Sequence, residues 1–213
     1  EAFLHSVKFP YTVGYGMTEC GPAIAFDHWQ TFRPTSCGKA VDRMEIRIDS
    51  SDPFNQVGEI LTKGMNVMDG YYNNPEASNT VLSPDGWLHT GDLGVLDPDG
   101  YLYIKGRSKS LILGPSGQNI YPEEIEARLN NMRCVMESLI VDRNGRLVAL
   151  VVPDYEQADN EGVDHAKLQE IMNENLKELN TQVAAYERIA EIMLYPTEFE
   201  KTAKRSIKRY LYR

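Results

Sequence analysis

The sequence has few cysteines, and no spacing that would join them into a framework. Cys20, Cys37 and Cys134 are its only three, they lie far apart, and no Cys-x-x-Cys pair occurs. An odd number of widely spaced cysteines argues against a disulfide scaffold and against a zinc site. We therefore expect three packed free thiols that behave as small apolar side chains, in a cytoplasmic protein.

Long apolar runs are also missing. No stretch approaches the roughly 20 consecutive apolar residues that cross a bilayer, and residues 1–10 have neither segment of a signal peptide. The net charge of -9, from 22 basic and 31 acidic residues, argues against a nucleic-acid surface. We expect no transmembrane segment and no nucleic-acid partner, and peripheral contact with a membrane is left open.

The composition is otherwise that of a globular protein with room for one large or two modest domains. Short alternating runs and turns fill the chain up to residue 106, and longer helical patterns alternate with strands from Arg107 onward. We therefore predict a mixed α+β fold, with a β-barrel-like part over residues 1–106 and a small α+β domain over residues 107–213.

Most of the expected elements follow from periodicity and turn residues. In the first part we expect a strand over 6–16, a small antiparallel sheet or barrel from 44–48 and 57–64, a helix capped by Asn74, and a hairpin around residues 98–100. In the second part we expect a helix from Pro122, a hairpin turning at Asn144-Gly145, and a helix over 166–179 whose apolar stripe is buried.

Three runs carry residues suited to chemistry, and the first is 15–19 (YGMTE) at the end of the expected strand. Gly16 permits a sharp turn and a close ligand approach, while Tyr15 offers a flat face for a base. Thr18 offers a hydroxyl to a phosphate, and Glu19 offers oxygens to Mg²⁺. On its own this run also fits an ordinary polar turn.

The other two runs are 86–92 (GWLHTGD) and 106–110 (GRSKS). Asp92 is suited to accept hydrogen bonds from two ribose hydroxyls, or alternatively to stabilise its own loop. Arg107 is suited to ribose or phosphate oxygens, or is a surface arginine. Gly114 and Gly117 make the following loop permissive of unusual dihedral angles.

In their order and spacing, the three runs together resemble the adenylate-forming superfamily of acyl-CoA synthetases, adenylation domains and luciferases over nearly the whole chain. The flanks, residues 5–22, 33–46 and 198–213, look most like bacterial long-chain fatty-acid CoA ligases. The resemblance implies that the first part ends a large adenylation domain and that the second is its mobile carboxy-terminal domain.

The resemblance also implies roles for single residues. Tyr15, beside Gly16, would pack on adenine, Thr18 would contact the phosphates, and Glu19 would act in catalysis by binding Mg²⁺. Asp92 and Arg107 would hold the ribose.

The implied reaction joins a fatty acid to coenzyme A through an acyl-adenylate made from ATP, with AMP released. Lys109 falls at the family's hinge, and Gly117 lies in the loop that the family places near the pantetheine arm. Closure of the mobile domain would exclude water that otherwise hydrolyses the adenylate.

Two departures from the family matter. Its Ser/Thr/Gly-rich phosphate loop, which ends in Lys and lies upstream of the first run, does not occur here, so we expect a fragment without full adenylation activity. In residues 202–209 (TAKRSIKR) Ser206 takes the position of the family's catalytic lysine, so Lys204 or Lys208 would replace it, or the run is a solvated basic tail.

Three other functions fit the same runs. Two are enzymatic, a fatty-acyl-AMP ligase that loads a carrier protein and an amino-acid adenylation domain. The third is a non-catalytic module that binds nucleotide or a partner. The four residues Thr18, Glu19, Asp92 and Arg107 favour a catalytic parent.

Overall fold

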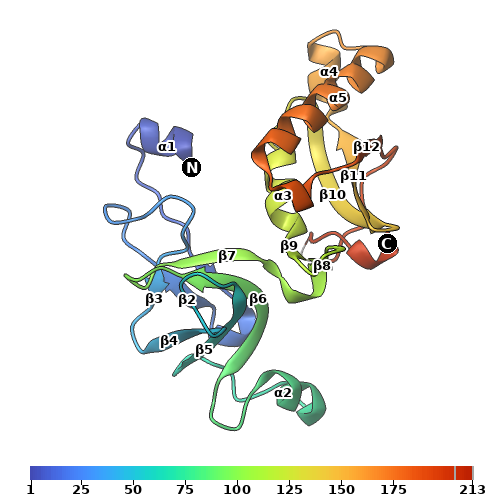
Figure 1. Cartoon of the computed structure of the whole chain (residues 1–213). Helices are drawn as coiled ribbons and strands as arrows, with labels where there is room; N and C mark the ends of the chain where they lie inside the picture. The colour runs from blue at the N-terminus through green and yellow to red at the C-terminus, as the bar shows by residue number, and fades with distance from the viewer. Residues whose placement is uncertain (204, 213) are drawn as a thin grey trace. The chain divides into compact units, whose positions relative to one another are not determined.

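The computed structural model describes residues 1–203 and 205–212. The chain divides into two units, Glu1–Lys109 and Ser110–Arg213, and each is described by itself. Figure 1 shows the elements of both units along the chain.

The first unit is built from two antiparallel sheets that share a core. One sheet has the order β4-β5-β6-β7 and the other β1-β2-β3. Ala25 of the second sheet packs with Ile48, Ile60 and Leu102 of the first. The strands are β1 (Tyr15–Gly16), β2 (Ala23–Phe26), β3 (Lys39–Ala40), β4 (Met44–Asp49), β5 (Gly58–Gly64), β6 (Leu88–Leu96) and β7 (Leu102–Arg107).

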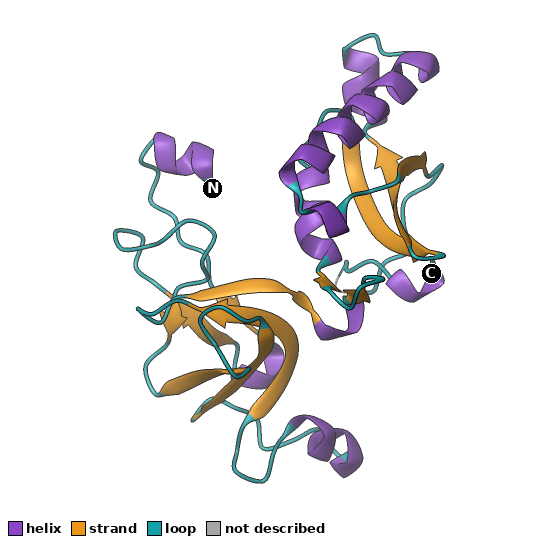
Figure 2. Ribbon diagram, in the orientation of Figure 1, coloured by secondary structure: helices purple, strands orange, loops and turns teal. Residues whose placement is uncertain are grey.

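No closed barrel forms among the described residues, because β4 and β7 end the larger sheet as edges and do not pair with each other. The predicted barrel-like part is therefore two open sheets, whose strands are coloured orange in Figure 2. The predicted strand over 6–16 is wrong except at its end. Helix α1 (Ala2–Ser6) precedes it, and only β1 has a partner strand.

One short helix of this unit begins where the sequence predicts a cap. Helix α2 (Pro75–Val81) starts after Asn74, whose side chain accepts a hydrogen bond from the Ala77 amide at 3.0 Å. This cap satisfies one of the amides that a helix leaves free in its first turn. The 3-10 turn η1 (Thr18–Cys20) follows β1 directly.

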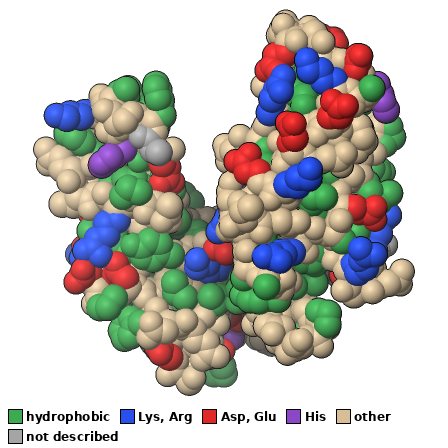
Figure 3. All heavy atoms as spheres, turned by 45° about the horizontal axis from the view of Figure 1, so that its top comes forward, with side chains coloured by type: hydrophobic (Ala, Val, Ile, Leu, Met, Phe, Trp, Pro, Cys, Tyr) green, Lys and Arg blue, Asp and Glu red, His purple; other side chains and the backbone are tan. Residues whose placement is uncertain are grey.

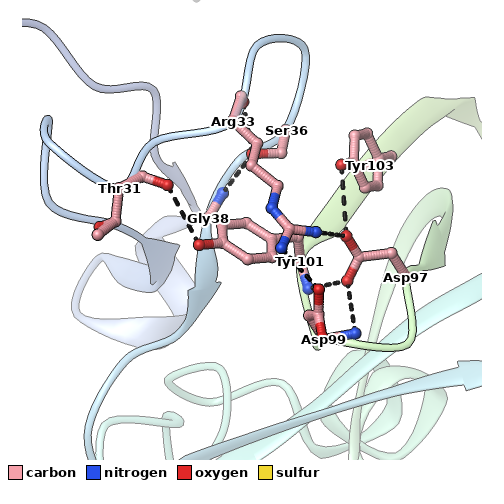
Figure 4. A network of polar contacts seen from close by, with 8 residues as sticks. All are labelled: Thr31, Arg33, Ser36, Gly38, Asp97, Asp99, Tyr101 and Tyr103. Atoms are coloured by element: carbon pink, nitrogen blue, oxygen red, sulfur yellow. Dashed lines mark hydrogen bonds and ion pairs between the residues drawn. The ribbon is translucent and has the colours of Figure 1, made fainter.

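A polar cluster fixes the loop between β2 and β3 to the turn between β6 and β7 (Figure 4). The Arg33 guanidinium donates to Asp97 and Asp99, at 2.6 Å each, and lies 4.1 Å from the centroid of the Tyr101 ring. Asp97 also accepts the Tyr101 amide at 2.9 Å, which closes the predicted turn at residues 98–100. The cluster therefore has a structural explanation within the first unit.

The second unit is a three-stranded sheet covered on both faces. Strands β10 (Val135–Arg143) and β11 (Arg146–Pro153) form the predicted hairpin, and β12 (Glu191–Leu194) pairs in parallel with β11. Helices α3 (Pro122–Leu129) and α5 (His165–Gln182) pack on one face, and the chain after β12 packs on the other. The remaining elements are η2 (Ser108–Ser110), β8 (Ile112–Leu113), β9 (Asn119–Ile120), α4 (Tyr155–Asn160), η3 (Ala185–Glu187) and η4 (Arg209–Leu211).

Two further features concern possible membrane and nucleic-acid contacts. In the described part of the chain, every helix is too short or too polar to cross a bilayer. Acidic and basic side chains alternate over the face in Figure 3.

Candidate functional site

The segment of β6 that carries Asp92 is held by hydrogen bonds within its own strand and to β5, so the tight turn expected from the sequence lies within a strand. The Thr90 hydroxyl donates to the Ile60 carbonyl at 2.7 Å and accepts the Asp92 amide at 3.1 Å. Gly91 has a φ of +72°, a conformation that glycine adopts without strain, and its amide donates to Glu59 Oε1 at 2.9 Å. The carboxylate is therefore held in place before any ligand arrives.

Two other residues that the sequence predicts to bind nucleotide, Tyr15 and Arg107, contact this carboxylate. The Tyr15 hydroxyl donates to Asp92 Oδ2 at 2.6 Å, and Arg107 Nη1 lies 3.2 Å from Asp92 Oδ1. Asp92 and Arg107 face each other in the ladder between β6 and β7. The Asp92 side chain is only 13% exposed and that of Arg107 is 62% exposed, so the guanidinium is open to a ligand.

Tyr15 acts as a hydrogen-bond donor in this arrangement. Burial, and then the hydrogen bond to Asp92, raise the pKa of its phenol well above the ordinary value. The hydroxyl therefore stays protonated, and its ring packs against the core through neighbours that include Ile24. The predicted stacking of this ring on adenine stays a prediction.

Gly16 follows Tyr15 at a position where no larger residue fits. A Cβ there would collide with the carbonyl of Pro22, because the backbone folds back on itself between β1 and β2. The next turn exposes the Thr18 side chain and leaves Glu19 half-buried. The first predicted run therefore presents a hydroxyl and a carboxylate from one tight turn.

Glu19 is held from outside its own run. Tyr71 donates its hydroxyl to Glu19 Oε1 at 3.0 Å, and the Met68 amide donates to the Glu19 carbonyl at 2.8 Å. Sequence reasoning missed Tyr71, and also Glu59, which binds the Gly91 amide and lies 2.8 Å from His89 Nδ1. Both contacts join distant residues, so only the fold could reveal them.

The described residues fit magnesium only together with a nucleotide. No group of three or more His, Cys, Asp or Glu side chains that could hold a metal occurs in the part of the chain that the structure describes. Mg²⁺ commonly takes one or two carboxylates and completes its shell with substrate phosphates and water. Glu19, half-buried with one oxygen engaged by Tyr71, is suited to that partial role.

In the second unit, the loop around Gly117 borders a pocket of about 480 Å³. Gly117 has a φ of +83°, and its amide donates to the Gly114 carbonyl at 2.9 Å. The pocket combines apolar walls with two guanidinium groups that have no carboxylate partner among the described residues. Its lining includes Leu113, Pro115, Arg146, Tyr186 and Arg188.

The tail places Ser206 in a small hairpin. A β-bridge joins Lys201 to Ile207, and Arg205 between them has a φ of +60°. Lys208 Nζ lies 3.2 Å from a Glu200 carboxylate oxygen, while Lys204 lies outside the described residues. Of the two lysines predicted to replace the family's lysine, the described one is therefore ion-paired.

Comparison with known proteins assigns the family. One family model, the AMP-binding enzyme, matches residues 2–72, and another, the AMP-binding enzyme C-terminal domain, matches residues 109–212. The chain belongs to the adenylate-forming acyl-CoA synthetase superfamily and corresponds to the carboxy-terminal region of its members. The broad resemblance inferred from the three runs is confirmed, and with it the class of fold.

Individual members of the superfamily extend well beyond this chain. A 4-coumarate-CoA ligase 2 from Narcissus pseudonarcissus is 34% identical over 84% of the chain, which corresponds to 32% of that relative. A putative acyl-CoA synthetase, YngI, from Bacillus subtilis is 32% identical over 95% of the chain and 37% of the relative. The chain thus spans about a third of the length of these curated relatives.

Solved structures of the superfamily share the fold. O-succinylbenzoate coenzyme A synthetase from Bacillus subtilis in complex with AMP superposes with a TM-score of 0.78, at 29% identity over 99% of this chain and 42% of that one. The same enzyme with ATP and magnesium gives 0.77. These relatives are named for 4-coumarate and O-succinylbenzoate, so the narrower resemblance to long-chain fatty-acid CoA ligases stays a prediction.

Proposed function

We propose that this chain is the carboxy-terminal part of an AMP-forming acid–CoA ligase and that its first unit holds the adenosine end of ATP. The observation that carries the proposal is the cluster of Tyr15, Asp92 and Arg107, in which a preorganised carboxylate lies beside an exposed guanidinium. Such a pair suits the two hydroxyls of a ribose, because the carboxylate accepts from them and the guanidinium donates.

The neighbouring turn supplies the phosphate end of the proposed site. Thr18 donates its hydroxyl to a phosphate oxygen, and Glu19 binds the Mg²⁺ that accompanies the triphosphate. That ion neutralises phosphate charge, which favours attack at phosphorus. The Tyr15 ring and the Gly16 backbone border the base.

The proposed reaction has two steps. A carboxylate oxygen of the acid attacks the α-phosphorus of ATP, and pyrophosphate leaves with the electrons of the broken bond. The sulfur of coenzyme A then attacks the acyl carbon, AMP leaves, and the thiol proton passes to solvent or a base. The anhydride makes the second step favourable, provided water is excluded.

The pocket in the second unit is suited to part of coenzyme A. Arg146 and Arg188 offer charge to its phosphates, and Leu113 and Tyr186 offer apolar surface to a flat or aliphatic segment. Gly117 keeps the adjoining loop free of a side chain. Arg146→Ala and Arg188→Ala are expected to raise KM for coenzyme A without changing the adenylation step.

Lys109 lies at the end of the first unit, and we propose it as the hinge. The cation that replaces the family's catalytic lysine is proposed to be Lys204 or Lys208. Lys208 would first have to leave Glu200. Glu200 is exposed and Lys208 is half-buried, so breaking the pair should cost little, because ion pairs near the surface contribute roughly 0–1 kcal/mol.

For the acid itself we propose a long-chain fatty acid, on the basis of the flanking sequence alone. Relatives named for 4-coumarate and O-succinylbenzoate make aromatic acids the alternative. A fatty-acyl-AMP ligase, an amino-acid adenylation domain and a non-catalytic nucleotide- or partner-binding module remain the other candidates. A cytoplasmic location and peripheral membrane contact also stay predictions.

The test is acid-dependent exchange of pyrophosphate into ATP by the full-length protein that carries this chain. Fatty acids of graded length, 4-coumarate, O-succinylbenzoate and a mixture of amino acids are offered in turn. Asp92→Ala is expected to abolish exchange, and Asp42→Ala, whose side chain is 96% exposed, is expected to leave it unchanged. Absence of exchange with every acid contradicts the enzymatic proposal and favours the binding module.

A further inference from the structure

We propose that Tyr71 is a positioning residue, which orients the Glu19 carboxylate toward the cation that accompanies the triphosphate. The inference rests on the proposed function of the Glu19 turn. Its starting observation is the 3.0 Å hydrogen bond from the Tyr71 hydroxyl to Glu19 Oε1, which joins residues 52 positions apart.

The contact leaves the carboxylate free to bind a cation. A carboxylate has about four acceptor positions, and Tyr71 takes one of them. All of Oε2 and the second position of Oε1 remain open to a metal or its waters. The hydrogen bond stops rotation of the carboxylate, so less orientational freedom is lost when a cation binds.

Tyr71 can transmit this order because it is itself anchored. Its amide donates to the Ser78 hydroxyl at 2.8 Å, and its carbonyl accepts the Asn74 amide at 3.1 Å. The Ser78 hydroxyl in turn donates to the Asn74 carbonyl at 2.9 Å. A Cβ at Gly70 would lie 2.9 Å from that hydroxyl, so the turn before Tyr71 is packed tightly on α2.

A second contact holds the same turn from the backbone. The Met68 amide donates to the Glu19 carbonyl at 2.8 Å, so the segment 68–71 forms hydrogen bonds with both the main chain and the side chain of Glu19. Removing the tyrosine hydroxyl alone therefore releases the carboxylate without detaching the turn. This separation makes the phenylalanine variant informative.

The neighbouring residue provides a matched control. Tyr72 is 94% exposed and Tyr71 is 37% exposed, and no hydrogen bond of the Tyr72 hydroxyl is found among the described residues. Tyr71→Phe and Tyr72→Phe remove the same hydroxyl from adjacent positions. A difference between them reports the bond to Glu19 and not the loss of a phenol in general.

The experiment measures binding, in the full-length protein that carries this chain. Isothermal titration with ATP at graded free Mg²⁺ gives the Mg²⁺ concentration at half-saturation, and titration with AMP without Mg²⁺ gives the affinity for the adenosine end. We expect Tyr71→Phe to raise the half-saturating Mg²⁺ about tenfold, as for loss of a hydrogen bond to a charged group. AMP affinity is expected to change less than twofold, and Tyr72→Phe is expected to change neither quantity.

Glu19→Gln and Glu19→Asp complete the set. Glu19→Gln is expected to raise the half-saturating Mg²⁺ at least as far as Tyr71→Phe does, and Glu19→Asp, which withdraws the carboxylate from Tyr71, is expected to fall between wild type and Glu19→Gln. Two results with Tyr71→Phe overturn the positioning role. One is that AMP affinity and Mg²⁺-dependent ATP binding fall equally, and the other is that neither falls. A wild-type protein that binds neither nucleotide contradicts the proposed function itself, whatever Tyr71 does.

Discussion

The Arg209 guanidinium donates to both carboxylate oxygens of Glu126, at 2.8 and 2.7 Å, across 83 positions of the sequence. Glu126 lies on α3 and is 7% exposed, and its Oε1 also accepts the Ile140 amide at 2.7 Å. The pair therefore fastens the carboxy-terminal tail to both α3 and the sheet of the second unit.

Breaking this pair from one side is expected to destabilise the second unit. Arg209→Met would leave a buried carboxylate without its cation, which typically costs about 3–5 kcal/mol. The loss is measured as faster hydrogen exchange of the β10 and β11 amides. Lys208→Met removes an ion pair whose members are 32% and 66% exposed, and it should cost at most about 1 kcal/mol. Equal loss of stability in the two variants would show that the buried pair stabilises the unit no more than the more exposed pair does.

Gly91 gives a prediction about the segment of β6 that holds Asp92. Gly91→Ala has room for its Cβ, whose nearest neighbour is Arg107 Nη2 at 3.8 Å, but it must adopt a φ of +72°. The strain is about 1–2 kcal/mol. Rotation of the backbone would relieve this strain but would displace the Asp92 carboxylate, which should weaken AMP binding several-fold. Gly100→Ala has a similar φ of +87° and open space, but it lies in the β6–β7 turn. Gly100→Ala should lower the free energy of unfolding as much as Gly91→Ala does and should leave AMP affinity unchanged.

The turn between β10 and β11 predicts that two substitutions at one position differ in their effect on stability. Asn144 and Gly145 both have positive φ, at +57° and +77°, as a two-residue type I′ turn requires. Asn144→Val should destabilise the second unit by about 1–2 kcal/mol, whereas Asn144→Gly should be nearly neutral. Thermal unfolding followed by circular dichroism distinguishes them, and a stable valine variant would contradict the turn.

Thiol chemistry tests the packing of the cysteines. Cys20, Cys37 and Cys134 are free, and all three are at most 8% exposed. Burial raises the pKa of the Cys37 thiol, which lowers the fraction of reactive thiolate. The native protein should therefore resist iodoacetamide at about pH 8 while all three thiols react in urea, as mass spectrometry would count. Rapid labelling of a native cysteine would place it at the surface.

Glu161 gives a prediction about pH. Hydrogen bonds from Arg133, and then from Gln157, hold the pKa of its carboxyl below the ordinary value. A lowered pKa in the folded protein contributes stability above the unfolded pKa, and the contribution is lost as pH falls through the folded value. The stability difference between wild type and Glu161→Gln should therefore shrink between about pH 6 and about pH 3. A difference that persists in acid would assign the effect to something other than charge.

Local patterns in the sequence were sufficient for several elements. The stripe of Leu168, Ile171 and Met172 lies buried on α5, and the Asn144-Gly145 turn joins β10 to β11 as predicted. In each case the signal is contained in a few adjacent residues. The strand expected over 6–16 failed over residues 6–14 for the opposite reason, because a strand needs a hydrogen-bonding neighbour that the local sequence does not specify.

The sequence nominated candidate site residues but not the geometry that joins them. The sequence nominated Asp92 and Arg107 separately, and only the register between β6 and β7 places them opposite each other. Tyr71 gave no signal, because its importance depends on which residue its hydroxyl reaches. The ion pair of Lys208 with Glu200 was likewise not predictable, since nothing in the local sequence specifies which carboxylate the lysine reaches.

The ladder pairing of Asp92 with Arg107 has a consequence for how the protein is divided. Tyr15, Asp92 and Arg107 all precede Lys109, where the first unit ends. A cut after that residue would leave every member of the cluster on one polypeptide, so the proposed ribose site depends on the first unit alone. Replacing the second unit should therefore leave the three side chains of the proposed ribose site in place.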